Sequence, residues 1–389
     1  MDSFDPIDEI WLQKAKKRYA SAVIGAPGAD RIPVDPMMLS HSTVFYGYTI
    51  REFYENPKLA ATCLAHAQQH YDLLPVTKYY FAHPWLPELG INLKYMDLTA
   101  PVPTNIVVNE PEDAEKIEIP SAEDIRSGYT FNRLTMAMDY IKETYPNMFV
   151  PLAYVPEPVG AGAELCGLEQ FFMWCQTERD LAKKLVDIYV ETATMGAEAI
   201  AKRYGMALLN TSAVLENSDT MSPEMIGDIS PPALNKLVRN CLSKGAGPQI
   251  FYHFCGNHKD DYMLYPGRIV FTPLTIMQIG YWDREEFPAE VMKNTFGNLC
   301  AIMPSVDTKL FVIEDNQKEI YEHARAQIEN GIDTKCGMIL GTTCEVPPLS
   351  YEYNIKSLVK AAEDFGRYDL RKEHQAPLLI HNRYRIRQR

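Results

Sequence analysis

A histidine and two cysteines are the residues of this chain best suited to bind a metal ion. His253 and Cys255 lie two residues apart in the apolar run 248–255, PQIFYHFC, which is typical of a buried strand. Alternate side chains of a strand share one face, so His253 and Cys255 can point to the same place. Gly256 then permits a sharp turn. Cys344 follows another apolar run, 337–341, and would also lie at the end of a strand.

One imidazole and two thiolates suit a tetrahedral Zn²⁺ ion whose fourth position stays open, which is typical of a catalytic site. Structural zinc sites more often use close pairs such as C-x₂-C, and this sequence contains no such pair. The residues alone leave two other interpretations open. Cys255 could be a small buried hydrophobe and His253 a core histidine, or the protein could be a binding module with a structural zinc.

The elements that must position these residues alternate along the chain. Apolar runs typical of strands are followed by amphipathic stretches with helical spacing. This alternation favours a (β/α)₈ TIM barrel, in which catalytic residues lie at the C-terminal ends of the strands. We expect an N-terminal helical extension over 1–85, the catalytic barrel over 86–370 and a C-terminal tail over 371–389. The expected strands lie within 148–155, 207–211, 248–255, 268–282, 299–306 and 337–341.

Two late helices have recognisable end signals. Gly331 follows a run with Ile320, Ala324 and Ile328 on one face, and we expect it to be a left-handed C-cap. Asn354 is the expected N-cap of a later helix.

Composition and charge limit the class of protein. The net charge of −13 argues against a nucleic-acid partner, because backbone phosphates would be repelled. No apolar run approaches the ~20 residues of a membrane span, and the N-terminus has no apolar segment typical of a secretory signal. Eight scattered cysteines do not indicate a disulfide framework. These features favour a cytoplasmic enzyme.

Several segments resemble a known family. Residues 252–257, YHFCGN, resemble the H-x-C-G-N stretch of the methylcobamide:coenzyme M methyltransferases, which share the barrel of uroporphyrinogen decarboxylase. Residues 330–366 are similar to the closing strand, cysteine–acid–proline loop and helix of these enzymes, and residues 30–34 and 54–57 to their N-terminal opening. The resemblance implies a zinc site formed by His253, Cys255 and Cys344. It also implies a corrinoid (cobalamin) carried by a partner protein.

The implied reaction moves a methyl group between a small methylated substrate and the cobalt of the corrinoid. A thiol, a methyl ether and a methylated amine are the candidate substrates. Aromatic residues at Phe45, Tyr46, Tyr48 and 79–81 could cap the barrel mouth, which would suit O-demethylation of an aromatic methyl ether, although such residues are also common in any barrel core. A longer stretch near 259–273 departs from the family pattern and leaves the substrate open.

The family also provides a candidate fourth ligand. Some members bring a carboxylate to the zinc from the strand after H-x-C, and Asp283 and Glu285 are the first acids after that strand here. Water is the alternative ligand. These acids could also simply stabilise the N-terminus of the following helix.

A uroporphyrinogen decarboxylase is the other enzyme to consider. That enzyme has an arginine-rich stretch near its N-terminus for the carboxylates of its substrate, because cations match acidic groups. Residues 33–48, PVDPMMLSHSTVFYGY, contain no arginine or lysine, which argues against decarboxylation.

Overall fold

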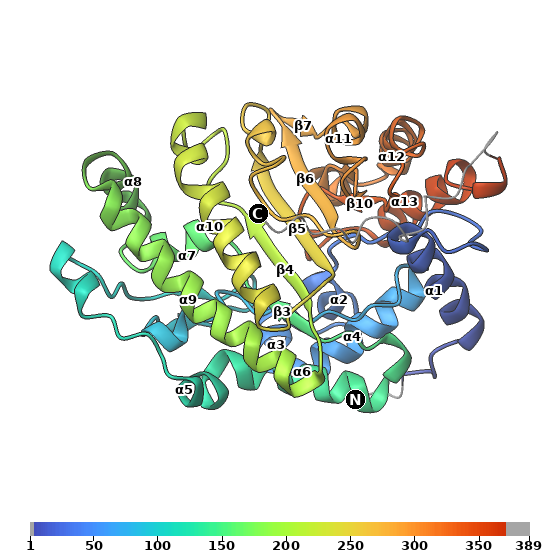
Figure 1. The fold of residues 1–389 in the computed structure, drawn as a ribbon. Helices are drawn as coiled ribbons and strands as arrows, with labels where there is room; N and C mark the ends of the chain where they lie inside the picture. Colours follow the sequence, from blue (N-terminus) through green and yellow to red (C-terminus); the bar gives the residue numbers. More distant parts are fainter. Residues whose placement is uncertain (1–3, 371–389) are drawn as a thin grey trace.

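The computed structural model describes residues 4–370, and the predicted tail over 371–389 lies outside this part. At its centre is a parallel sheet with the order β3-β4-β5-β6 (Figure 1). The strand β8 also pairs with β6 in parallel. After a turn, the short strand β7 pairs with β6 in antiparallel orientation. The strands are β3 (Leu152–Tyr154), β4 (Leu208–Ala213), β5 (Ile250–Asn257), β6 (Ile276–Trp282), β7 (Glu285–Glu286), β8 (Ala301–Ile302), β9 (Ser305–Val306) and β10 (Gly341–Thr342).

Shorter parallel pairings continue the sheet into a barrel-like ring. Ile302 bridges Met338, and β9 pairs with β10. The chain near residue 340 then pairs with an N-terminal segment, because Val34 bridges Leu340. Residues 74–77 connect that segment to the β3 side. The backbone N–H of Leu74 donates to Val34 over 3.1 Å and that of Thr77 donates to Met148 over 3.1 Å.

Each of the six apolar runs predicted to hold a strand overlaps one. The runs beginning at 148, 207, 248 and 268 overlap β3, β4, β5 and β6, and the run beginning at 299 contains β8 and β9. The observed β4 and β5 extend past the predicted ends, and β10 shares only Gly341 with the run 337–341. Apolar runs identify these strands because both faces of a parallel barrel strand are covered.

Long helices cover the outside of the sheet. In Figure 1, α9 and α10 cross its front, and α11, α12 and α13 lie on the other side of β6. Each helix buries an apolar stripe against the strands or a neighbouring helix. This outer layer consists of α6 (Tyr129–Thr144), α7 (Pro158–Glu164), α8 (Leu168–Thr177), α9 (Arg179–Tyr204), α10 (Pro223–Ser243), α11 (Ala289–Phe296), α12 (Gln317–Gly331) and α13 (Glu352–Phe365).

Both predicted helix ends were wrong. Gly331 is the last residue of α12 and is not left-handed; Ile332 follows as the C-cap. A Cβ atom on Gly331 would lie 3.2 Å from Met338 and from Pro304, so close packing explains the glycine. Asn354 lies inside α13, whose N-cap is Tyr351, because its amide donates to two carbonyls of a neighbouring loop instead.

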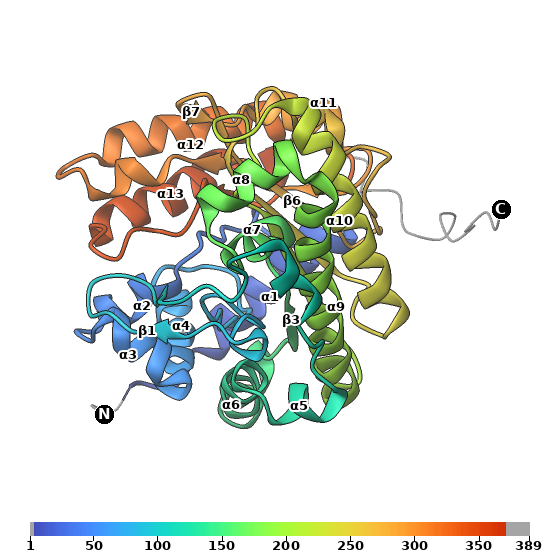
Figure 2. The same cartoon turned by 90° about the vertical axis from the view of Figure 1, so that its left-hand side faces the viewer.

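The N-terminal third is largely helical, and Figure 2 shows α2, α3 and α4 together beneath α12 and α13. The boundary at residue 85 remains a prediction, although residues 32–37 already pair with the end of the barrel. None of the helices described is long and apolar enough to cross a membrane. The remaining elements are α1 (Glu9–Ile24), α2 (Leu39–Phe45), α3 (Ile50–Glu55), α4 (Pro57–His70), α5 (Ala122–Ser127) and the hairpin of β1 (Leu93–Lys94) and β2 (Val102–Pro103).

Candidate metal centre

The three residues singled out in the sequence lie together at the C-terminal ends of the strands. His253 and Cys255 are on β5, and Cys344 is in the loop directly after β10. One ligand atom from each of the three lies within 4.8 Å of the other two, and the two sulfur atoms are 3.5 Å apart. All three side chains are only partly buried, so a substrate could reach them. The donors are those that zinc prefers, and their convergence fits a single ion.

Gln278 orients the imidazole of His253. The two residues are paired in register on β6 and β5, and the Gln278 side-chain oxygen lies at Nδ1 of His253. The Gln278 nitrogen faces the carbonyl oxygens of Thr342 and Thr343, at 3.1 and 3.2 Å. Since carbonyl oxygens only accept hydrogen bonds, the amide can take only this orientation. Nδ1 of His253 therefore carries a proton, and the lone pair of Nε2 is left free for a metal.

Gly256 gives β5 the turn that places Cys255. Its φ of +87° lies in the left-handed region, and the pairing with β6 is irregular between Phe254 and Asn257. A Cβ atom at this position would lie 2.9 Å from the Asn217 amide. The glycine predicted for the turn is therefore required both by the backbone conformation and by this close contact.

The two thiols titrate as a pair. A hydrogen bond between the Cys255 and Cys344 sulfur atoms lowers the pKa of Cys344 well below its usual range despite burial, and His253 lowers it further. The same hydrogen bond, together with burial, raises the pKa of Cys255. One thiolate is thus already favoured before a metal binds, and a cation would favour the second.

A second histidine holds the backbone next to Cys255, and the sequence analysis did not identify it. His258 and Asp261 are both fully buried, and Nδ1 of His258 lies 2.8 Å from Asp261. Its Nε2 donates to the carbonyl oxygen of Cys255 over 3.0 Å. The spacing H-x₂-D within the loop after H-x-C was the available signal. Asp261 also accepts from Ser218, so this network ties the β5 loop to the loop after β4.

Two further acids lie near the thiols and were also missed. Glu345 accepts from the backbone and hydroxyl of Ser40, and burial raises the pKa of its carboxyl to about 7. Glu157 follows β3 with an unusual φ of +25°. Burial and repulsion from Glu164, Glu216 and Cys344 raise the pKa of Glu157 well above its usual value. Strained backbone in a non-glycine residue is often found at functional sites.

The structure does not bring either candidate fourth ligand to the cluster. Asp283 lies on the surface in an ion pair with Lys259 over 2.6 Å, and Glu285 is exposed on β7. The side chain of β6 that faces His253 is Gln278, where the strand was expected to offer a carboxylate. Among the described residues, the group that could hold a metal comprises only His253, Cys255 and Cys344.

The predicted aromatic cap is divided between two places. Phe45 packs against Tyr46 and against His70 and Tyr71 of the α4 region. Tyr80 lies against Tyr154 instead and accepts from Asn210 of β4.

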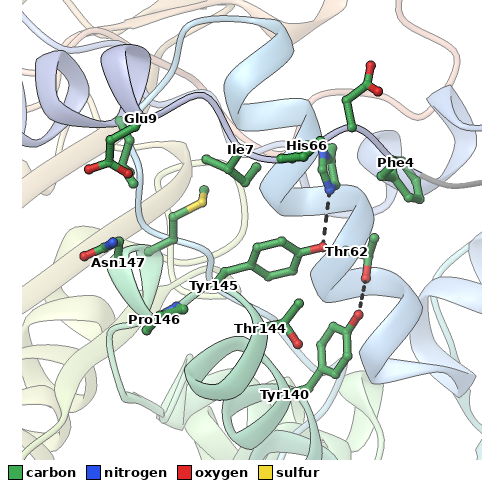
Figure 3. Close-up of a pocket in the computed structure, with 14 residues that line it drawn as sticks. Phe4, Ile7, Glu9, Thr62, His66, Tyr140, Thr144, Tyr145, Pro146 and Asn147 are labelled. Atoms are coloured by element: carbon green, nitrogen blue, oxygen red, sulfur yellow. Dashed lines mark hydrogen bonds between the residues drawn. The ribbon is translucent and has the colours of Figure 1, made fainter.

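A cavity of about 530 Å³ lies at the opposite end of the barrel, beside the residues that precede β3 (Figure 3). Its polar groups pair with each other, since His66 bonds to Tyr145 and Thr62 bonds to Tyr140. Phe4 stacks on His66. The cavity shares no lining residue with the three-residue cluster.

Comparison with known proteins agrees with this geometry. The family model described as uroporphyrinogen decarboxylase (URO-D) matches residues 14–365, nearly all of the described chain. The chain belongs to the URO-D family. Membership confirms the barrel type predicted from the sequence. The URO-D match includes β3 to β10 and all three residues of the cluster.

Two proteins similar to this chain are methyltransferases. The methylcobamide:CoM methyltransferase MtaA of Methanosarcina barkeri (strain Fusaro / DSM 804) is 22% identical over 208 residues, which are 54% of this chain and 56% of that protein. The match thus spans little more than half of that relative. A solved methyltransferase from Methanosarcina mazei is 19% identical with a TM-score of 0.74, covering 90% of this chain and 99% of that one. This second likeness shows a shared fold.

Proposed function

We propose that this URO-D family protein is a zinc-dependent, corrinoid-dependent methyltransferase. The observation that carries the proposal is the convergence of His253, Cys255 and Cys344 at the strand ends, where barrel enzymes perform chemistry. The named activity of the Methanosarcina barkeri relative supports the same class. The methyl group would pass between a small methylated substrate and a corrinoid carried by a partner protein.

His253, Cys255 and Cys344 would hold the ion, whose chemistry when bound is Lewis-acid activation of a substrate heteroatom. The chain itself contributes orientation and charge. Gln278 keeps Nε2 of His253 free, and His258 fixes the backbone of Cys255. Two thiolates and a neutral imidazole would cancel the charge of a divalent ion, so the centre would be neutral overall.

Decarboxylation of the kind that names the family is less well supported. Arg18 and Arg31 precede the N-terminal segment 32–37, and both are buried in ion pairs. Arg18 pairs with Asp30 and Asp72, and Arg31 pairs with Asp72. Lys78 is likewise paired with Asp35. These cations are already used within the protein, so they do not form a clamp for substrate carboxylates.

Methyl transfer to free cob(I)alamin tests the proposal. The zinc-loaded protein is mixed with cob(I)alamin and a panel of methylated ethers, thiols and amines, and formation of methylcobalamin is followed by visible absorbance. We expect turnover of at least one class, and its loss in Cys344→Ala. Full zinc occupancy with no transfer in either direction would favour a binding module with a structural zinc instead.

A further inference from the structure

A second, smaller cavity lies on the same side of the barrel as the metal centre. It has a volume of about 180 Å³, enough for one compact organic group. Its walls come from the loop after residue 82, the loop after β3 and helices α7 and α9. The polar residues that line it are His83, Tyr154, Glu157, Glu164 and Tyr189.

One carboxylate of this cavity is already neutralised. Nδ1 of His83 lies 2.9 and 2.8 Å from the two carboxyl oxygens of Glu164, and its Nε2 lies 3.0 Å from the carbonyl of Pro101. Both partners accept hydrogen bonds, so both ring nitrogens carry protons. Burial lowers the pKa of His83, but Glu164 and Pro101 outweigh it and the net pKa is raised. Glu164 and His83 therefore form a balanced ion pair.

The other carboxyl group has no such partner. The side chain of Glu157 makes no hydrogen bond within the described part of the chain, although its backbone N–H donates to Ser212 over 3.0 Å. A Cβ atom on Gly160 would lie 2.5 Å from the Glu157 carboxyl oxygen, so the group folds back over the first turn of α7. The hydroxyl of Tyr189 is buried without a partner. Such a group is costly, and here it lines the same open space as the partly buried Glu157 carboxyl.

The charges around Glu157 select the sign of a ligand. Glu164 and Glu216 lie within electrostatic reach of Glu157 and repel a negative charge at this place, although His83 balances the charge of Glu164. An anion in the cavity would meet the same repulsion, whereas a cation would relieve it. Two tyrosine rings among the lining residues add surfaces on which alkylammonium groups bind favourably.

We propose that this cavity binds the ammonium group of a small methylated organic cation, which makes such cations the substrate class of the enzyme. An ammonium nitrogen has no lone pair, so a metal held by the three residues would act on a second heteroatom of the substrate. The inference rests on the proposed methyltransferase function for its meaning, but the binding itself does not require turnover. Tyr154 ends β3 and Glu157 follows it, so a head group held between them would lie at the same end of the strands as the thiols. A thiol that also carries an anionic group such as a sulfonate would be disfavoured.

Calorimetry with choline and its uncharged isostere 3,3-dimethyl-1-butanol tests the inference on the purified full chain. We expect choline to bind at least tenfold more tightly than the isostere. Glu157→Gln should remove most of this preference, while Glu169→Gln, which removes an exposed carboxylate on α8, should leave it unchanged. Should Glu157→Gln fail to fold, Glu164→Gln provides a second test. This variant removes the carboxylate that balances His83, so choline should lose its preference over the isostere.

Equal binding of the two ligands by the wild-type protein would overturn the inference and requires no variant. A choline preference that persists in folded Glu157→Gln would also overturn it. Methyl transfer measured in parallel separates the two proposals. Transfer without a choline preference contradicts only the cavity inference, and a choline preference without transfer to any corrinoid contradicts only the proposed function.

Discussion

The amide oxygen of Gln278 accepts the Nδ1 proton of His253, and the two residues face each other in register on neighbouring strands. Gln278→Leu removes this acceptor without removing a ligand. Residues that orient metal-binding histidines typically contribute about 10–100-fold in affinity. We expect zinc affinity to fall by about that factor, measured by competition with a colorimetric chelator.

Gln327→Leu is the matched control for this experiment. Gln327 is also a buried glutamine bonded to backbone groups, at Ala289 and Phe287, but it lies on α12 away from the cluster. Both variants should lose some thermal stability, and only Gln278→Leu should lose zinc affinity. Equal zinc affinity in the two variants would mean that Gln278 does not contribute to metal binding.

The three proposed ligands should together determine the zinc content. We expect about one zinc per chain in the wild-type protein, and loss of most of it in His253→Ala, Cys255→Ala and Cys344→Ala. The barrel should stay folded, because the three side chains are only partly buried, at the end of β5 and in the loop after β10. Elemental analysis with circular dichroism measures both. Cys336→Ala, a partly exposed cysteine outside the cluster, should keep its zinc.

Gly256→Ala should disturb the metal centre through the backbone. A left-handed alanine costs about 1 kcal/mol, and here the new Cβ would also collide with Asn217. Gly47→Ala separates the two effects, since Gly47 has a φ of +85° with nothing within 4 Å of its Cβ position. We expect chemical denaturation to show a larger loss for Gly256→Ala, and zinc affinity to fall in that variant alone. Equal losses of stability would mean that the contact with Asn217 is unimportant.

Glu216 should make stability depend on pH. This carboxyl is fully buried, and burial raises its pKa from 4.5 to about 7, with repulsion from Asp261 adding to the effect. The folded state therefore binds the proton more tightly than the unfolded state, so this contribution is present below pH 4.5 and is lost as pH rises through about 7. The resulting change in the free energy of unfolding between low and high pH amounts to about 3 kcal/mol.

Glu216→Gln removes this titration. Relative to the wild-type protein, the variant should gain stability steadily between pH 5 and pH 8 in urea denaturation, because only the wild-type residue must ionise. A stability difference that stays constant over this range would show that Glu216 does not titrate there.

The sequence could predict that His253, Cys255 and Cys344 come together, because their arrangement depends on local rules. The spacing of His253 and Cys255 follows from the two-residue period of a strand, and Cys344 follows from the rule that barrel sites lie after strands. Gln278 could not be found in this way, because its contact with His253 depends on the register between β5 and β6. Glu157 was missed for a different reason, since no pattern of residue types reveals a glutamate with positive φ.

The helix ends show the same limit. Asn354 has the residue type of an N-cap, but a neighbouring loop offers its side chain two carbonyl groups, and the helix begins earlier. Tertiary contacts that arise from distant segments override such local preferences.

The pairing of Val34 with Leu340 constrains the order in which the chain can fold during its synthesis. The segment at Val34 cannot form this pairing until some 300 further residues have been synthesised. The hydrogen bond from Ser40 to Glu345 likewise forms only after Glu345 has been synthesised. Contacts so distant along the chain form slowly, and an unpaired strand edge invites association with other chains in the meantime. Cys344 is made in the same late stretch, so the complete set of three donors exists only once the ring can close. Any metal bound by these three donors would therefore be loaded only at the end of folding.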